Sequence, residues 1–163
     1  MSEATVTAAI QAFLAPTAGI TKLYKAPPLE LTGDNWQTNS LPGTPAFLHM
    51  EHKIESRITV PANHGGQKQV DYTFALMLLY QYDTPTAMPS QDSWADGLVA
   101  LTDAVTDRIR SDPAFNSGGV IFEAGNQDGG IEIHKDFPHW DKDSGKVRNW
   151  LKVAFKVTEI VTV

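Results

Sequence analysis

The stretch "LHMEHKIESRITV", residues 48–60, decides the fold because its side chains alternate in kind over thirteen positions. Its even positions are mostly apolar and its odd positions are mostly charged, and this two-residue period predicts a β-strand with one face on a core. The same period recurs in "QVDYTFALMLLYQY", residues 69–82. Between them lies "PANHGGQK", residues 61–68, whose proline, asparagine and paired glycines are typical of turns. The two strands are therefore predicted to form a long antiparallel β-hairpin.

Two histidines and a glutamate stand close together in the first strand, at His49, Glu51 and His52. These residue types suit a metal site or acid/base chemistry. Successive side chains of a strand point to opposite faces, so His49 and Glu51 are expected on one face and His52 on the other. Three side chains divided in this way do not converge on one ion, and no metal-binding or catalytic residue is predicted here.

The rest of the chain predicts an α+β fold, a mainly antiparallel sheet with a long β-hairpin and two packed helices, in one domain spanning residues 1–163. Helical spacing of apolar residues predicts helices over Thr5–Leu14 and Ser90–Asp112. Alternation predicts a short strand over Ile20–Lys25 and a final strand over Val147–Val163, and "GGVIFEA" and "IEIHK" around "GNQDGG" are interpreted as a second hairpin. Four prolines and two glycines predict a loop over Ala26–Pro45, and its apolar residues Leu29, Leu31, Trp36 and Leu41 favour an ordered one.

Composition excludes several classes of function. The chain has 163 residues, with 13 basic and 19 acidic side chains, and a net charge of −6 disfavours attachment to nucleic acid or to an anionic membrane. It has no cysteine, so it contains neither disulfides nor thiolate metal sites. The N-terminal "MSEATVTAAIQAFLAP" holds no long apolar run, so neither a signal peptide nor a membrane span is expected.

A second polar cluster lies in "IHKDFPHWDKDSGK", residues 133–146. Its His134, Asp136, His139, Asp141 and Asp143 are of the types that bind zinc or non-haem iron. Their spacing fits no metallohydrolase helix, and the aspartate-rich piece lacks the distant glutamate of a calcium loop. A turn is the favoured interpretation. Because the common nucleophile, nucleotide and zinc-protease motifs are also missing, we predict no enzymatic activity and no cofactor. A small metal-dependent hydrolase using His134, His139 and Asp141 is one alternative.

The hairpin predicts an oligomer. Strands of thirteen residues extend roughly 40 Å, so part of the hairpin is expected to need contact with another chain. Exposed strand edges pair readily with other chains, and a head-to-tail contact that closes gives a ring. The predicted subunit contact comprises the charged strand face and the hairpin tip: Glu51, Lys53, Glu55, Arg57, Asn63, His64, Gly65, Gly66 and Gln67.

Four segments in order, "FLHMEHKIESRITVP", "QVDYTFALMLLYQY", "SWADGLVALTDAVTDRIRSD" and "WLKVAFKVTEIVTV", give the chain a layout that resembles the tail terminator, or tail completion, proteins of long-tailed bacteriophages. The resemblance implies a small structural subunit of the virion, assembled in the host cytoplasm. It would form a hexameric ring at the head-proximal end of the tail tube, end tube polymerisation and join the tail to the neck. Its implied partners are the tail tube protein and a neck or connector protein, and the family has no catalytic residues to carry over. Another neck or head-completion protein, or a host binding module that uses the loop from Ala26 to Pro45, are further alternatives.

Overall fold

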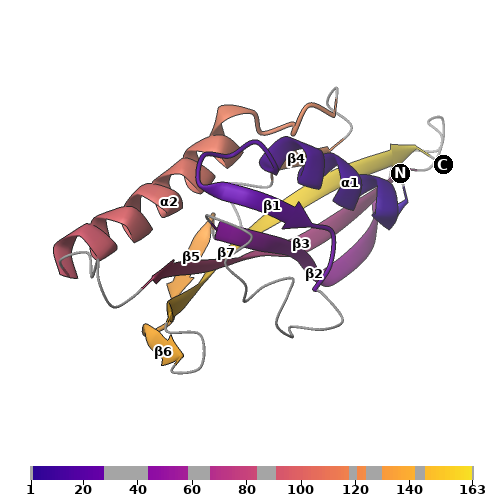
Figure 1. Ribbon diagram of the computed structural model, residues 1–163. Helices are drawn as coiled ribbons and strands as arrows, with labels where there is room; N and C mark the ends of the chain where they lie inside the picture. Colours follow the sequence, from indigo (N-terminus) through magenta and orange to yellow (C-terminus); the bar gives the residue numbers. More distant parts are fainter. Residues whose placement is uncertain are drawn as a thin grey trace.

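The computed structural model describes residues 2–27, 44–58, 67–83, 91–117, 121–123, 130–141 and 146–162. In these ranges two helices pack on one side of a mainly antiparallel seven-stranded sheet (Figure 1), which confirms the predicted α+β class. The elements are α1 Glu3–Leu14, β1 Ile20–Tyr24, β2 Thr44–Ile58, β3 Gln67–Asp83, α2 Gln91–Ser111, β4 Ile121–Glu123, β5 Glu132–Lys135, β6 His139–Asp141 and β7 Lys146–Thr162. The predicted loop therefore ends earlier than Pro45, which already lies in β2 opposite Lys22 of the parallel strand β1. Residues 28–43 of that loop lie outside the described ranges.

The long hairpin of β2 and β3 is confirmed, with antiparallel register from Ala46 opposite Leu78 to Ile58 opposite Gln67. The strand β3 is also paired along its whole length with β7, from Gln67 opposite Thr162 to Asp83 opposite Lys146. The contact with another chain stays a prediction, but the far end of β3 does not need one for support. The chain's own C-terminal strand supplies that support, because β7 is as long as β3.

The predicted second hairpin was also wrong. Its two segments contain β4 and β5, and both pair antiparallel with β7, so they run in the same direction. The strand β6 also pairs antiparallel with β7, and the three short strands lie end to end along one edge of β7. The first residues of β4, β5 and β6 lie opposite Glu159, Ala154 and Arg148, respectively. The seventeen residues of β7 offer a longer ladder of backbone hydrogen bonds than two short strands can offer each other.

One face of the sheet, the helix-covered face, holds the core. It is formed by buried side chains of the two central strands, Val70, Tyr72, Phe74, Leu76 and Leu78 of β3 and Leu151, Val153, Phe155 and Val157 of β7. Buried aromatic rings link this face to the rest of the chain. Phe155 lies 6.1 Å from Phe74 and 5.9 Å from Phe115 between ring centroids, and Phe115 meets Phe13 of α1 edge to face at 5.4 Å.

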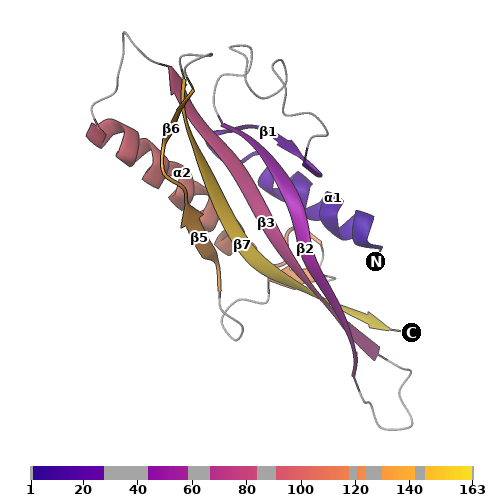
Figure 2. The same cartoon turned by 90° about the horizontal axis from the view of Figure 1, so that it is seen from below.

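The other side of the sheet, the open face, is polar at one end and apolar at the other. It carries Asp71, Thr73, Ala75, Met77 and Leu79 of β3 and Trp150, Lys152, Ala154, Lys156, Thr158 and Ile160 of β7. Figure 2 shows the sheet in front of both helices, so neither helix covers this face. Phe47 of β2 packs edge to face on Trp150, with 6.0 Å between centroids.

Gly19, in the turn between α1 and β1, tests how tightly α2 packs. Its φ is +89°, and a Cβ added there would lie 2.9 Å from Cδ1 of Leu101 in α2. We expect Gly19→Ala to lower the free energy of unfolding by about 2–4 kcal/mol, through backbone strain and overpacking together. Gly130→Ala is the matched control, because its φ is +69° but nothing lies within 4 Å of the added Cβ. Urea denaturation of both variants gives the comparison, and equal losses would show that Leu101 moves aside without cost.

Candidate subunit-contact surface

A β-bulge at Glu51 fixes the geometry of the predicted contact surface. The register of β2 with β3 passes from Met50 opposite Phe74 to His52 opposite Thr73, so Glu51 is an extra residue in β2. Such a bulge places two residues of one strand opposite one residue of the other. Beyond it the faces of β2 are exchanged: Lys53 lies opposite Tyr72 and Glu55 opposite Val70, on the helix-covered face.

This exchange corrects the predicted faces. Strict alternation placed Ile54 on the core side, but Ile54 lies opposite Asp71 on the open face and is 48% exposed. A shift of one residue moves every following side chain to the other face, and β3 contains no compensating bulge.

The histidine cluster is corrected by the same bulge. His49 lies opposite Ala75 and His52 opposite Thr73, so both share the open face with Glu51, and the predicted division between two faces was wrong. Even so, no group of three potential ligands among the described side chains is arranged to hold a metal ion. The Glu51 carboxylate instead forms an ion pair with Lys152 of β7, at 2.5 Å. Together with Thr73, Glu132 and Lys156, this pair lines a shallow pocket on the open face.

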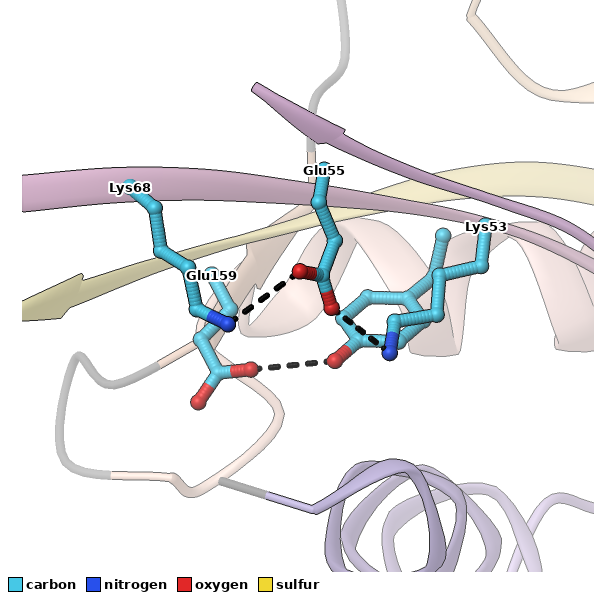
Figure 3. A network of polar contacts seen from close by, with 5 residues as sticks. Lys53, Glu55, Lys68 and Glu159 are labelled. Atoms are coloured by element: carbon cyan, nitrogen blue, oxygen red, sulfur yellow. Dashed lines mark hydrogen bonds and ion pairs between the residues drawn. The ribbon is translucent and has the colours of Figure 1, made fainter. Parts of the chain in front are cut away.

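The charges beyond the bulge form a polar network on the helix-covered side (Figure 3). Glu55 accepts from Lys53 at 2.8 Å with one carboxylate oxygen and from Lys68 of β3 at 3.2 Å with the other. Beside them, the Tyr72 hydroxyl donates to Glu159 of β7 at 3.1 Å, and Glu159 is only 1% exposed. The network therefore ties the far ends of β2, β3 and β7 together.

The network also sets the ionisation of its members. The hydrogen bond with Lys53, followed by that with Lys68, lowers the pKa of Glu55, and the bond to Glu55 raises the pKa of Lys53. Burial raises the pKa of the Tyr72 hydroxyl. Lys53 therefore stays charged and Tyr72 stays protonated at neutral pH.

Titration of Glu55 checks this pairing. Because the folded pKa of Glu55 lies below the unfolded value, its contribution to stability is present above the unfolded pKa and is lost as the pH falls through the folded one. We expect the carboxyl ¹³C resonance of Glu55 to titrate below the ordinary glutamate range, and to return to it in the double variant Lys53→Met, Lys68→Met. An ordinary midpoint in the wild type would contradict the pairing.

Three of the four predicted contact charges are thus already paired within the chain: Glu51 with Lys152, and Lys53 and Glu55 with each other. What β2 presents outward is its backbone edge. The strand β1 pairs only with Thr44–Phe47, so from Leu48 to Ile58 no strand of the described ranges lies along the outer side of β2. Such an edge is a template for pairing with another chain.

The remaining predicted contact residues are only partly placed. The backbone of Arg57 lies opposite Lys68, and Gln67 begins β3, but the side chains of Arg57 and Gln67 lie outside the described part. Asn63, His64, Gly65 and Gly66 fall entirely in the range 59–66, which is not described. The contact at the hairpin tip stays a prediction.

The second polar cluster is spread along the edge of β7. His134 of β5 lies opposite Lys152 and 3.6 Å from Glu132, while His139 of β6 lies opposite Arg148. Asp136 is held at this edge by its backbone, because its N–H donates to the Trp150 carbonyl at 3.0 Å. The side chain of Asp141 and all of Asp143 lie outside the described part. The described side chains of this cluster form no metal-ligating group.

Sequence reasoning missed the bulge and two residues that shape these edges. The bulge at Glu51 gave no signal, because the apolar residues of its strand keep an even spacing on both sides of it. Asn149 and Glu159 are each 1% exposed. Both are polar residues on the otherwise apolar core side of the final strand, and that break in the pattern was the available signal.

Comparisons with known proteins give likenesses of structure alone. No family model matches the chain, and no curated protein matches it. Among solved structures, a chain of the "Virion of native gene transfer agent (GTA) particle" is similar over 96% of this chain and 99% of that chain, with 13% sequence identity and a TM-score of 0.30. A likeness at that score carries no inference about function. In the described part, no helix is long and apolar enough to cross a membrane.

Proposed function

We propose that this chain is a structural subunit of a phage-like virion that forms a ring. The observation that carries the proposal is the pair of free edges of its sheet, along β2 on one side and along β5 on the other, within the described ranges. A protein with two complementary edges adds copies head to tail, and a constant rotation between copies closes the series.

The directions of the strands favour this assembly. Each neighbour in the series β2, β3, β7, β5 is antiparallel to the one before, so β2 and β5 run in opposite directions. A copy rotated about an axis along the strands keeps its strand directions. Its β2 then meets the β5 of the previous copy as an antiparallel pair, the arrangement with perpendicular hydrogen bonds.

Within the virion, we place the ring at the head-proximal end of the tail tube, where it ends tube polymerisation and joins the tail to the neck. This position rests on the resemblance in segment order to tail terminator proteins. The net charge of −6 suits a ring through which DNA passes, because an acidic lining does not hold phosphates. The proposed role is non-catalytic and needs no cofactor, and its partners are further copies, the tail tube protein and a neck protein.

The proposal is tested by mass and by tube length. Size-exclusion chromatography with light scattering is expected to give about six times the 17.8 kDa of one chain, with rings in negative stain. Added to polymerising tail tube protein, the ring is expected to shorten the tubes and to be found at one end. A monomer at high concentration that forms no ring with tube protein would overturn the proposal. A ring that leaves tube growth unchanged would place the chain elsewhere in the neck.

A further inference from the structure

Phe137 is the most exposed of the large apolar side chains that the structure describes, at 94%. It lies between the end of β5 at Lys135 and the start of β6 at His139, on the sheet edge opposite to β2. A single exposed apolar residue is common on protein surfaces. Phe137 differs because the backbone that carries it is held in place.

Two hydrogen bonds and a proline fix that backbone. The N–H of Asp136 donates to the Trp150 carbonyl at 3.0 Å, and the Asp136 carbonyl accepts from Nδ2 of Asn149 at 2.6 Å. Pro138 has a fixed φ and restricts the residue before it, which is Phe137. The aromatic ring is thus presented from a fixed position, which lowers the entropy that binding would otherwise cost.

Asn149 stands at a position where an apolar side chain would be more stable. It is 1% exposed, it lies on the core side of β7 between Val147 and Leu151, and its Oδ1 has no hydrogen-bond partner within the described ranges. A buried, unsatisfied polar atom costs about 1–3 kcal/mol. The Asn149 amide donates a hydrogen bond to the Asp136 carbonyl, next to Phe137. Polar residues at core positions of this kind occur chiefly at functional sites.

We propose that Phe137 is the anchor by which one copy of this chain holds the β2 edge of the next copy, an inference that rests on the proposed ring. Two observations favour a second copy as the occupant. The free edge of β2 carries its own exposed apolar side chain, Ile54. The two edges run in opposite directions, so they meet without reversing either copy.

The test compares three variants of the full chain by light scattering over a dilution series. Phe137→Ser is expected to raise the concentration at which the ring half-dissociates at least tenfold, without changing the melting temperature of the subunit. Val99→Ser is the matched control, because Val99 is 46% exposed on α2, and its ring is expected to dissociate as in the wild type. Asn149→Leu is expected to weaken the ring although its subunit melts at the same temperature or higher, since Asn149 acts by positioning the backbone.

The outcomes separate this inference from the proposed function. A wild-type chain that never forms a ring overturns both. If the wild-type ring forms and Phe137→Ser dissociates at the same concentration, the anchor is wrong and the ring stands. A Phe137→Ser ring that is intact but no longer ends tubes shows that Phe137 faces the tube protein, which also overturns the anchor. Unchanged assembly of Asn149→Leu overturns the positioning role of that residue.

Discussion

Replacing Phe155 with alanine is expected to lower the free energy of unfolding by about 3–5 kcal/mol, a large part of the total for a domain of this size. Phe155 is 1% exposed on β7 and is the middle ring of three, with Phe74 of β3 on one side and Phe115 on the other. Phe115 lies in the turn that follows the end of α2 at Ser111, has a left-handed φ of +50°, and reaches Phe13 of α1. Removing the middle ring therefore opens a cavity between the sheet and both helices.

Urea denaturation followed by far-UV circular dichroism measures this loss. Phe47→Ala is the control for removing a phenylalanine from the sheet, because Phe47 is only half-buried and meets Trp150 on the open face. Its expected cost is about 1–2 kcal/mol. If the two variants lost the same stability, the core would not lie between the helices and the sheet as described.

The second large effect is expected from a comparison of two deletions, one in each of the two strands that meet at the bulge. Deleting Glu51 removes the extra residue of β2 and leaves Met50 opposite Phe74 and His52 opposite Thr73, so every other pairing is kept. What is lost is the ion pair with Lys152, whose side chains are about one-third exposed. Such a pair contributes about 0–1 kcal/mol, so the melting temperature is expected to fall by only about 2–4 °C.

Deleting Thr73 from β3 is expected to abolish cooperative unfolding. This strand is paired on both sides, and a deletion at Thr73 moves either Val70 and Tyr72 or Phe74, Leu76 and Leu78 to the open face. Register cannot shift without burying polar side chains in place of apolar ones. Differential scanning calorimetry of the two deletions gives the comparison. A collapse of the Glu51 deletion comparable to that of the Thr73 deletion would show that β2 continues in strict alternation, as its sequence alone indicates.

The sequence was a good guide where neighbours along the chain decide the structure. The hairpin of β2 and β3 has a short connection and a sustained two-residue period, and α1 and α2 have helical spacing, so each element is specified within its own residues. The helix boundaries agree to within two residues with those predicted. The fold class follows from these elements, because amphipathic helices and a one-sided sheet bury their apolar surfaces against each other.

The candidate surface was predicted less well, for reasons visible in particular residues. The alternating charges of β2 drew attention to the correct strand, whose outer edge has no strand beside it beyond Phe47 in the described part. Their partners within the chain were not predicted, because Lys152 and Lys68, which pair with Glu51 and Glu55, come from other strands. The role of these charges in a subunit contact stays a prediction. Phe137 was not predicted as a contact residue, because local spacing indicates neither its exposure nor the hydrogen bond from Asn149 to the neighbouring Asp136 carbonyl.

Local patterns in the chain thus specify the period of each element, and with it the hairpin, the two helices and the apolar side of β7. Tertiary structure alone decided that β7 pairs with β3, that β4, β5 and β6 share one edge, and that the bulge at Glu51 exchanges the faces of β2. These pairings join residues that lie far apart in the chain, so local sequence patterns do not specify them. The Thr158 hydroxyl donates to Asp71 at 2.8 Å across 87 positions, and no window of neighbouring residues contains both members of such a pair.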